Sequence, residues 1–400
     1  MGSITKLVVS AVIVCLALTF LPGLPPHGTF TAHSVAPPMP LEGPLAPNTR
    51  LDGAEHLFEG EIKGPESFAV LGGALYTGVH GGHVVKILPD RIVPVAKFGK
   101  DCYGFWEEEK CGRPLGLKSG KDGFLYVVDA YYGVYKLNTT TGKSTLLVSK
   151  RVAVDGRKPQ LPNSVDVASD GTLYWTDSSS DYLLQDGVYT LLTDGTGRLF
   201  QYNPKTNSSK VLIDKLQFAN GVILSQEEDF VLVAETGRSR VHRYHLKGPK
   251  KGQRDIFLDG LPGLPDNLKP NGHGGFLVPL VASRDVNNSV LSQALGPYPL
   301  LRKFSARLLA LLDLVFHKIN HVFPNYFAQR ALHWVGHFES IVPLTPSRVI
   351  VLDVNSSGQI TGSLHCQDGT LTGISDIEVY NGYYYLGSPF NSYIGRVRIQ

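Results

Sequence analysis

The stretch LPNSVDVASDGTLYWTD, residues 161–177, contains two short strand-like runs joined by the turn residues Ser, Asp and Gly. Apolar and polar residues alternate in the first run, and the second run is rich in the aromatic and β-branched residues typical of strands. A similar phrase recurs at residues 64–78, 113–129, 218–235, 265–280 and 372–388. Each phrase predicts a β-hairpin, so the chain is predicted to be a repeat protein built from such hairpins.

The repeat has a period close to that of a β-propeller blade. Equivalent positions in the six phrases are Glu66, Leu115, Asn163, Asn220, Asn267 and Ser375, which are 49, 48, 57, 47 and 108 residues apart. Four-stranded blades around a central channel repeat about every 40–50 residues. The 400 residues also exceed the size that one ordinary core supports, which a repeat tolerates. We therefore predict an all-β, six-bladed β-propeller that spans residues 54–400.

The ring of a propeller must close, and the two ends of the predicted domain supply strands that can close it. The run EHLFEGEI, residues 55–62, is strand-like and precedes the first phrase. It can form the outer strand of the last blade, whose final strand is YIGRVRI, residues 393–399.

The gap of 108 residues contains an insertion of a different kind in blade 5, at about residues 290–340. Within it, residues 300–323 have apolar side chains at helical spacing and basic side chains elsewhere on the turn, which predicts an amphipathic helix. The apolar stripe comprises Leu301, Phe304, Leu308, Leu311, Leu312, Val315 and Ile319. The helix could pack on the rim of the propeller, form a lid over the channel mouth, or lie on a membrane surface.

The amino-terminal region predicts a membrane segment followed by a stalk. Residues 7–21 are apolar apart from Ser and Thr, and the stretch 4–24 approaches the ~20 residues that span a bilayer, which predicts a transmembrane segment at residues 1–24. A cleaved signal peptide would also fit, but small residues follow the apolar core only at 34–36, which favours an uncleaved anchor. The Pro- and Gly-rich residues 25–53 predict a stalk. Because Lys6 lies on the short side, we expect a single-pass type II protein of the plasma membrane or endoplasmic reticulum.

Several features agree with a lumenal or extracellular propeller. Glycosylation sequons begin at Asn138, Asn207, Asn287 and Asn355. Cys102 and Cys111 flank eight residues, and in an oxidising compartment they predict a small disulfide loop. The sequence contains no CxxC motif that would hold zinc, and its mild charge of +3 gives no indication of nucleic-acid binding.

Five oxygen-bearing side chains fall at or beside the equivalent positions of the repeat: Glu66, Asn163, Asn220, Asp266 and Asn267. Any one of them alone is explained as a turn residue. The inner strands of a propeller begin beside the channel, however, so these side chains should converge at the hub, where buried polar groups need partners. No Lys or Arg stands at an equivalent position, apart from Arg113 near the second phrase. Two carboxylates and three amides match the oxygen ligands that Ca²⁺ prefers, so we predict a calcium site.

These phrases also resemble a known family. The runs HLFEG, GPES, CGRPLGL, YWTDSSS, DYLL, EDFVLVAET, PDN and YLGS are similar to those of the strictosidine synthase-like proteins, in the superfamily of six-bladed propellers that includes paraoxonases and diisopropyl fluorophosphatase. The resemblance covers residue 57 to the carboxyl end and implies a central Ca²⁺ bound by the same five residues. Two departures matter: Ser375 stands where strictosidine synthases carry a glutamate base, and Leu115 stands where paraoxonases carry a histidine.

The predicted function is a calcium-dependent hydrolase of the arylesterase or lactonase type, which acts on a small ester or lactone. A Ca²⁺ ion can polarise a carbonyl without a serine nucleophile, and the chain lacks a G-x-S-x-G motif. The resemblance implies Asp266 as the attacking carboxylate, and Asp129, Asp177, Glu235 and His273 are candidate proton-transfer groups at the channel mouth. Two alternatives are a binding module with a structural calcium, and a condensing enzyme, which Ser375 disfavours.

Overall fold

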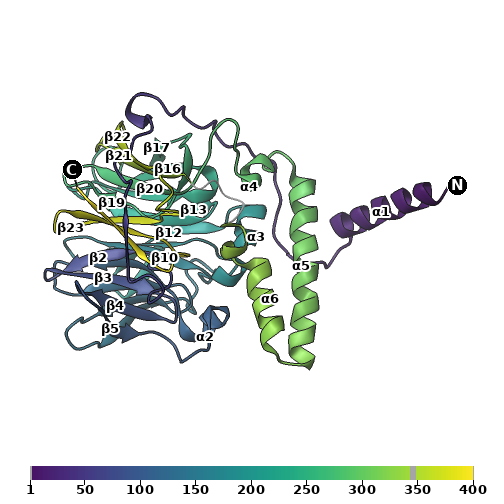
Figure 1. The fold of residues 1–400 in the computed structure, drawn as a ribbon, viewed down its shortest axis with the longest axis horizontal. Helices are drawn as coiled ribbons and strands as arrows, with labels where there is room; N and C mark the ends of the chain where they lie inside the picture. The colour runs from purple at the N-terminus through teal and green to yellow at the C-terminus, as the bar shows by residue number, and fades with distance from the viewer. Residues whose placement is uncertain (1, 343–347, 400) are drawn as a thin grey trace.

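The computed structural model describes residues 2–342 and 348–399, in which six antiparallel sheets surround a central axis (Figure 1). Blade 1 comprises β2 (Phe68–Leu71), β3 (Ala74–Val79), β4 (His83–Ile87) and β5 (Ile92–Lys97). Blade 2 comprises β6 (Pro114–Ser119), β7 (Leu125–Asp129), β8 (Gly133–Leu137) and β9 (Ser144–Ser149). Blade 3 comprises β10 (Pro162–Val167), β11 (Leu173–Asp177), β12 (Gly197–Asn203) and β13 (Ser208–Leu216).

The remaining blades follow the same order from the axis outward. Blade 4 comprises β14 (Ala219–Leu224), β15 (Phe230–Glu235), β16 (Arg240–His245) and β17 (Arg254–Leu258). Blade 5 has an inner strand in two pieces, β18 (Gly263–Pro265) and β19 (Lys269–Pro270), followed by β20 (Phe276–Ser283), β21 (Val349–Val354) and β22 (Ile360–Cys366). Blade 6 comprises β23 (Asp376–Tyr380), β24 (Tyr383–Gly387), β25 (Ile394–Arg398) and β1 (Glu55–Leu57). The predicted six-bladed propeller is confirmed.

The first and last strands close the ring, as the sequence predicts. β1 pairs with β25 in antiparallel register, with His56 opposite Gly395. Blade 6 is therefore built from both ends of the domain, and unfolding either end opens the ring.

Apolar side chains pack between neighbouring blades. Every residue of β7, β11, β14 and β15 is buried, because each of these strands contacts a blade on both faces. Between blades 2 and 3, for example, Tyr126 and Val128 share a buried cluster with Trp175 and Phe200, whose rings stack at 4.0 Å. The propeller therefore has a series of interblade cores around a polar hub.

The segment 25–53 differs from the predicted free stalk. Leu45 and Leu51 are buried in the clusters of blades 4 to 6. The backbone N–H of Met39 donates to the carbonyl of Gly260 at 2.8 Å, and that of Leu51 donates to His365 at 2.9 Å. Its few apolar residues pack onto the propeller, so this segment is part of the folded body.

Helices gather on one face of the propeller (Figure 1). The insertion between β20 and β21 forms α4 (Leu291–Ala294), α5 (Pro299–Val322), α6 (Tyr326–Gly336) and the 3₁₀ turn η5 (Phe338–Ser340). The loop between β11 and β12 adds η3 (Leu184–Asp186) and α3 (Gly187–Leu192). Two other 3₁₀ turns are η1 (Gly43–Leu45) and η4 (Thr236–Arg238).

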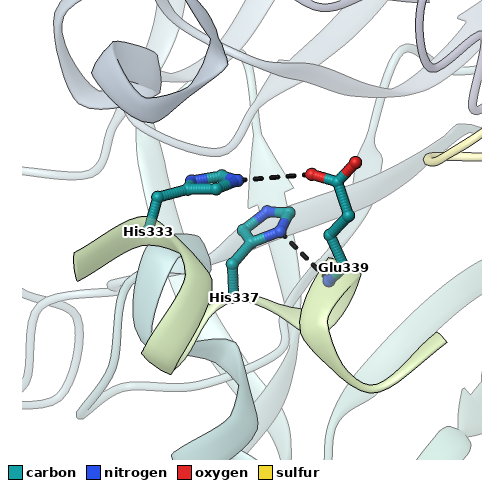
Figure 2. A group of neighbouring side chains, drawn as sticks. All are labelled: His333, His337 and Glu339. Atoms are coloured by element: carbon teal, nitrogen blue, oxygen red, sulfur yellow. Dashed lines mark hydrogen bonds and ion pairs between the residues drawn. The ribbon is translucent and has the colours of Figure 1, made fainter. Parts of the chain in front are cut away.

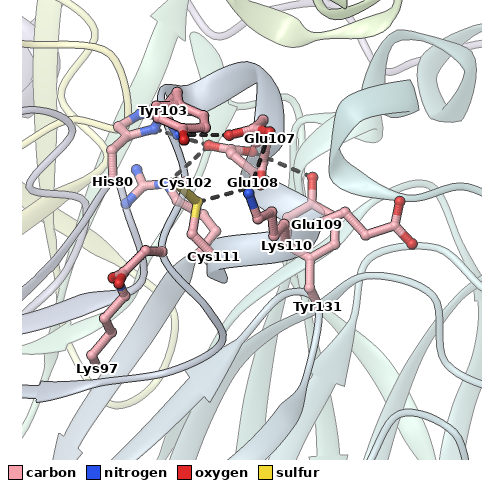
Figure 3. The surroundings of a disulfide bond; sticks show 12 residues. His80, Lys97, Cys102, Tyr103, Glu107, Glu108, Glu109, Lys110, Cys111 and Tyr131 are labelled. Atoms are coloured by element: carbon pink, nitrogen blue, oxygen red, sulfur yellow. Dashed lines mark hydrogen bonds and ion pairs between the residues drawn. A yellow bond between two sulfur atoms is a disulfide. The ribbon is translucent and has the colours of Figure 1, made fainter. Parts of the chain in front are cut away.

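The loop between blades 1 and 2 contains η2 (Phe105–Glu107) and α2 (Glu108–Cys111) on the same face. Figure 3 shows that the Cys102–Cys111 disulfide joins the two ends of this loop, with Cα atoms 5.6 Å apart. The predicted pairing is confirmed. The bridge constrains the short helix that carries Glu108.

Helix α1 (Ser3–Phe20) extends away from the body, and it is long and apolar enough to cross a membrane, although a signal sequence would have the same properties. The four sequons lie on loops between strands or beyond them. The side chains of Asn207 and Asn287 are exposed, whereas Asn138 and Asn355 are half-buried and accept hydrogen bonds from their own turns.

We expect Asn287→Gln and Asn207→Gln each to remove one glycan from the chain expressed in a eukaryotic cell, because both side chains are exposed. The measurement is gel mobility before and after glycosidase treatment. Ser289→Ala is the matched control, since it disrupts the sequon of Asn287 without changing the asparagine. If glycosidase treatment leaves the gel mobility of the wild-type chain unchanged, the predicted lumenal orientation is contradicted.

Candidate metal centre and cavity

The five predicted ligands meet at the hub. Asn163 and Asn220 occupy the second positions of β10 and β14, Glu66 precedes β2, and Asp266 and Asn267 interrupt the inner strand of blade 5. The Nδ2 atom of Asn267 donates to Oε1 of Glu66 at 3.2 Å, although 201 residues separate them. All five side chains are buried, with exposed fractions of 5% or less. The repeat therefore brings together the residues that the sequence selects.

Gly221 permits the close approach of blades 4 and 5 at this point. A Cβ atom at this position would lie 2.4 Å from the carbonyl oxygen of Asp266, which is closer than any side chain tolerates. The backbone N–H of Gly221 donates to the same oxygen at 3.1 Å. A glycine is thus required beside Asn220.

Hydroxyl groups set the orientation of the two asparagine amides. The Nδ2 atom of Asn163 donates to Oγ of Ser178 at 3.0 Å, and that of Asn220 donates to Oγ1 of Thr236 at 3.2 Å. Both hydroxyls in turn donate to backbone carbonyls, so they must accept from the amides. The amide oxygens are thereby left free.

Four buried oxygen atoms of the proposed ligands have no hydrogen-bond partner among the described residues, as is also true of Oδ1 of Asp376 beneath them. The four ligand oxygens are Oε2 of Glu66, Oδ1 of Asn163, Oδ1 of Asn220 and Oδ1 of Asp266. A buried unpaired acceptor is destabilising by about 1–3 kcal/mol. Four of them around one point form an oxygen-only set that fits a hard divalent cation such as Ca²⁺, and it offers none of the nitrogen or sulfur ligands that zinc prefers.

The electrostatics of the hub also favour a cation. Burial, followed by the charge of Asp266, raises the pKa of Glu66 well above its ordinary value. Burial, followed by the charge of Asp376, raises the pKa of Asp266 to about 8. These carboxylates are therefore destabilised as anions unless a positive charge lies between them.

Two charged residues beneath the site were not predicted from the sequence. Asp376 is fully buried, and its Oδ2 atom lies 3.2 Å from Nζ of Lys269, which is 3.0 Å from Glu378. Lys269 is thus a hub cation that the repeat positions did not reveal. Because it already pairs with two carboxylates, it does not neutralise Glu66 and Asp266. The signal available in the sequence was the position of Lys269, two residues after the predicted ligand Asn267.

A cavity of about 130 Å³ lies above the polar floor. Glu66, Asn163, Asn220 and Asp266 line its base. Its walls are largely apolar and include Leu115, Leu184, Leu191, Phe218, Leu264 and Val281. Such a site combines a few polar groups with an apolar enclosure that suits a small organic molecule.

The insertion supplies the roof of this cavity. His337, Phe338 and Ile341 line it from above, and the Phe338 ring meets the ring of Phe218 edge-on at 5.2 Å. The sequence leaves three placements open for the insertion: the rim, a lid over the channel mouth and a membrane surface. Of these, η5 and the residues around it form the lid.

A buried ionic cluster joins the roof to the cavity wall, and the sequence did not predict it. The carboxylate of Glu108 lies 2.9 Å from Nδ1 of His80, 3.7 Å from Nε of Arg113 and 3.7 Å from Nε2 of His337 (His80 and Glu108 appear in Figure 3). Burial raises the pKa of Glu108, but the hydrogen bond to His80 and the nearby charges outweigh it and lower the value to about 2. Glu108 is therefore an anion that contacts blade 1, blade 2 and the lid. Burial lowers the pKa of His337 to about 3, so its contact with Glu108 is that of a neutral imidazole. The only sequence signal of Glu108 was its position in the acidic run of the disulfide loop.

His333, His337 and Glu339 form a second group of possible metal ligands (Figure 2). The two imidazole rings stack 4.2 Å apart at 23°, so their in-plane lone pairs do not converge on one point. Nδ1 of His337 accepts from the backbone N–H of Glu339, and Nε2 of His333 lies 3.4 Å from the Glu339 carboxylate. Lys63 of blade 1 also lies 3.4 Å from Glu339. These contacts fasten η5 to α6 and to the propeller.

The structure does not place the candidate proton-transfer groups on the cavity lining. Asp129, Asp177 and Glu235 end the second strands of blades 2 to 4, where they are fully buried and accept backbone hydrogen bonds. Asp177 also pairs with Arg198 at 3.2 Å. The side chains of these three residues hold loops together, and strand position alone could not distinguish that role from catalysis.

His273 lies at the opposite face of the propeller. It is exposed in the turn between β19 and β20, and its N–H donates to Oδ1 of Asn271 at 2.9 Å. Because β20 runs from this turn toward the lid, His273 is separated from the cavity by the length of that strand. His273 and Asp129 therefore do not line this cavity, and their predicted role in proton transfer stays a prediction.

Comparisons with known proteins agree with this architecture. The strictosidine synthase family matches residues 163–249, and the family described as strictosidine synthase-like, N-terminal, matches residues 43–87. The adipocyte plasma membrane-associated protein Hemomucin of Drosophila melanogaster is 45% identical over 390 residues, which cover 96% of this chain and 67% of that protein. The adipocyte plasma membrane-associated protein of Rattus norvegicus is 38% identical over 363 residues, which cover 90% of this chain and 89% of that protein.

Solved structures share the fold at low sequence identity. A gluconolactonase from Xanthomonas campestris aligns with a TM-score of 0.54 at 14% identity, covering 95% of this chain and 99% of that chain. A luciferin-regenerating enzyme aligns with a TM-score of 0.52 at 12% identity, covering 86% of this chain and 95% of that chain. These similarities establish the propeller fold.

We expect Asp129→Asn to flatten the pH dependence of unfolding. Burial raises the pKa of Asp129 from 3.8 to about 7, so the native state favours its protonated form. The resulting stabilisation, about 4 kcal/mol at most, is present below pH 4 and is lost as the pH rises to 7. The measurement is the free energy of unfolding from pH 4 to 8 in saturating Ca²⁺.

Asn keeps the oxygen that accepts from Tyr131 and Tyr132 but has no charge to bury. Asp129→Ala is the matched control, because it loses that acceptor and should be destabilised at every pH. The raised pKa of Asp129 would be contradicted if the free energy of unfolding of the wild type rose between pH 5 and 7 and that of Asp129→Asn rose with the same slope.

Proposed function

The chain belongs to the adipocyte plasma membrane-associated protein family, and we propose that it is a calcium-dependent hydrolase of the arylesterase or lactonase type. The proposed substrate is a small ester or lactone. We further propose that α1 is an uncleaved anchor, which makes the chain a single-pass type II protein of the plasma membrane or endoplasmic reticulum with a lumenal or extracellular propeller. Its relatives are named as plasma membrane-associated proteins, and α1 has the required length and hydropathy.

One observation carries the proposal: four unpartnered buried oxygens form the base of an apolar-walled cavity. A purely structural ion needs the oxygens but not the cavity. An enzyme needs both, because the substrate carbonyl must reach the metal while its apolar parts are held by the walls. The five ligands proposed for Ca²⁺ are Glu66, Asn163, Asn220, Asp266 and Asn267.

Ca²⁺ bound at this site would supply Lewis-acid polarisation of the ester carbonyl. Among the ligands, Asp266 has an unpartnered Oδ1 atom and lines the cavity, so it can attack the carbonyl carbon or draw a proton from an attacking water. Leu184, Phe218 and Phe338 would exclude bulk water and hold the acyl or aryl group. Hydrolysis would yield a carboxylic acid and an alcohol or phenol.

The two alternatives make different use of the same hub. A binding module with a structural calcium would use the cavity for recognition alone, and only an activity measurement separates it from the hydrolase. A condensing enzyme would need an acid at the position of Ser375. The Oγ atom of Ser375 donates to the carbonyl of Glu66 at 2.9 Å, and the adjacent Asp376 is paired with Lys269, so neither is available as a base.

We expect chelation to lower the melting temperature, and Ca²⁺ to restore it, because an ion bound only to the native state stabilises it by about 2.7 kcal/mol at a hundredfold excess over Kd. Thermal unfolding in EGTA with and without added Ca²⁺ measures this change. Glu66→Gln removes one ligand charge and should abolish most of the response. The exposed Asp214→Asn is the matched control and should respond as the wild type does. A wild-type curve that is identical in EGTA and Ca²⁺ would contradict the calcium site.

We expect calcium-loaded protein to hydrolyse phenyl and naphthyl acetate slowly, and to be insensitive to serine-directed inhibitors, since no serine acyl-enzyme forms. Asp266→Asn should reduce the rate at least ~100-fold, the usual scale for loss of a general base or nucleophile. Asp214→Asn should retain the rate. Calcium content is measured on each variant, and loss of rate with calcium retained identifies Asp266 as the reacting group.

The proposal fails if calcium-loaded wild-type protein shows no hydrolysis above buffer across aryl esters and lactones. The calcium-binding module then becomes the better description of this fold.

A further inference from the structure

Helix α5 has its apolar face turned away from the protein. Residues of α5 that are exposed include Leu301, Leu308, Leu312, Val315, Ile319 and Val322, which are spaced three, four or seven residues apart and therefore share one face. The buried residues of the same helix are Arg302, Ala306, Arg307 and Ala310. A helix that packed on a soluble protein in the usual way would show the reverse pattern. The outward face of α5 therefore requires an apolar partner.

Specific polar contacts hold α5 in this orientation. Arg302 is fully buried, and its Nη2 atom donates to the carbonyl of Thr31 at 2.8 Å and pairs with Asp194 at 3.1 Å. Asp313 accepts a hydrogen bond from the Tyr189 hydroxyl of α3. Rotating the helix to bury its leucines would break these contacts and leave charged groups unpaired.

Helix α6 extends the apolar face. Phe327 is 81% exposed and Trp334 is 55% exposed, and α6 packs beside α5. Among the described residues, most of the exposed large apolar side chains outside α1 lie on this insertion. Exposed apolar side chains therefore occur on both of these packed helices, and we call the two sets together the α5–α6 face.

A second, independent observation identifies what covers this face. One Nη1 atom of Arg307 donates to the carbonyls of Leu18, Thr19 and Leu21, at 2.9–3.0 Å, and so binds the carboxyl end of α1 to the middle of α5. Figure 1 shows α1 projecting from α5 on the side away from the propeller, crosswise to α5. If α1 spans a bilayer, its end lies at the bilayer surface, and α5 must then lie along that surface.

The charges at the edge of the face fit the same partner. Lys318 and Arg330 are exposed beside the apolar residues, where their long side chains can reach lipid phosphates. A soluble partner would require the face to dissociate from the membrane to which α1 ties it.

We propose that the α5–α6 face lies in the surface of the bilayer that α1 crosses, and that the cavity beneath takes an apolar ester dissolved in that bilayer. The second half of this statement rests on the proposed hydrolase. The same insertion forms the bilayer-facing surface and the cavity roof, at His337, Phe338 and Ile341, so the roof lies between the lipid and the polar floor. The preferred ester would therefore be small enough for the cavity and apolar enough to partition into the bilayer.

The surface is tested without reference to activity. Nitroxide labels at Leu312→Cys and Val315→Cys in the full chain, with Cys15→Ser, are compared in phosphatidylcholine–phosphatidylserine vesicles with a label at Val379→Cys. Cys366 is buried and should not be labelled, and Val379 is exposed on blade 6, away from the lid. We expect both α5 labels to lose collisions with an aqueous nickel chelate and to gain collisions with oxygen, relative to Val379→Cys.

Two outcomes would overturn the proposal. The first is equal access of the nickel chelate to all three labels. The second is spin–spin broadening between Leu312 labels that disappears on dilution with unlabelled chain, which would show that a second copy covers the face.

The substrate class is tested with Leu312→Glu/Val315→Glu. We expect this variant to lose hydrolysis of naphthyl butyrate dissolved in vesicles and to keep the wild-type rate on phenyl acetate in water, because neither residue lines the cavity. An unchanged ratio of the two rates would overturn the membrane-dissolved substrate. If the wild type hydrolyses neither ester while the α5 labels are lipid-exposed, the hydrolase fails and the bilayer surface stands.

Discussion

Burying carboxylate oxygens at the propeller axis is the constraint on which the rest of the structure depends. Glu66, Asp266 and Asp376 reach the hub from three blades, and each is almost completely buried. Lys269 compensates Asp376, but Glu66 and Asp266 retain unpartnered oxygens beside those of Asn163 and Asn220. Burying these carboxyl groups as anions is unfavourable, so at this centre they are stable either as neutral acids or beside a bound cation. The closing pair β1–β25 and the glycine at 221 then allow the ring to form with these side chains in contact.

The sequence predicts the parts of the structure that depend on local patterns and on repetition. Strand alternation and turn residues recur with each blade, so the propeller and its closing strands could be predicted. Equivalent positions in such a repeat must converge at the hub, so the five proposed ligands could be predicted as well. The side-chain direction at a strand end is not a local property. An acid such as Asp177 or Glu235 can face a cavity or bind a loop, and in this fold it binds backbone N–H groups. The Lys269–Asp376 pair escaped detection because it depends on contact between blades 5 and 6.

The insertion shows a related limit. Helical periodicity in residues 300–323 reveals two faces but does not say which face the protein covers. The usual assumption, that apolar residues point inward, is wrong for α5, because Arg302 and Arg307 have specific carbonyl partners in the amino-terminal segment. The partner of Arg302, Thr31, belongs to the segment 25–53. This segment looked like a stalk because Pro and Gly dominate it, yet its backbone N–H and carbonyl groups and its few leucines bind it to the body. Polar contacts made by distant segments thus determine the orientation of the most apolar helix of the insertion.

The carboxyl groups at the floor and at the roof of the cavity have pKa values shifted in opposite directions. At the floor, burial and neighbouring carboxylates raise the pKa of Glu66 and Asp266, so each is stable there as a neutral acid or beside the proposed cation. At the roof, His80 and the surrounding charges lower the pKa of Glu108 to about 2, so this carboxylate stays ionised with partners that the chain itself provides. The Cys102–Cys111 bridge holds the helix that carries Glu108 whether or not the floor is occupied. The contacts that attach the lid to blades 1 and 2 therefore do not involve the proposed calcium ligands, which separates the roof of the cavity from the chemistry proposed at its base.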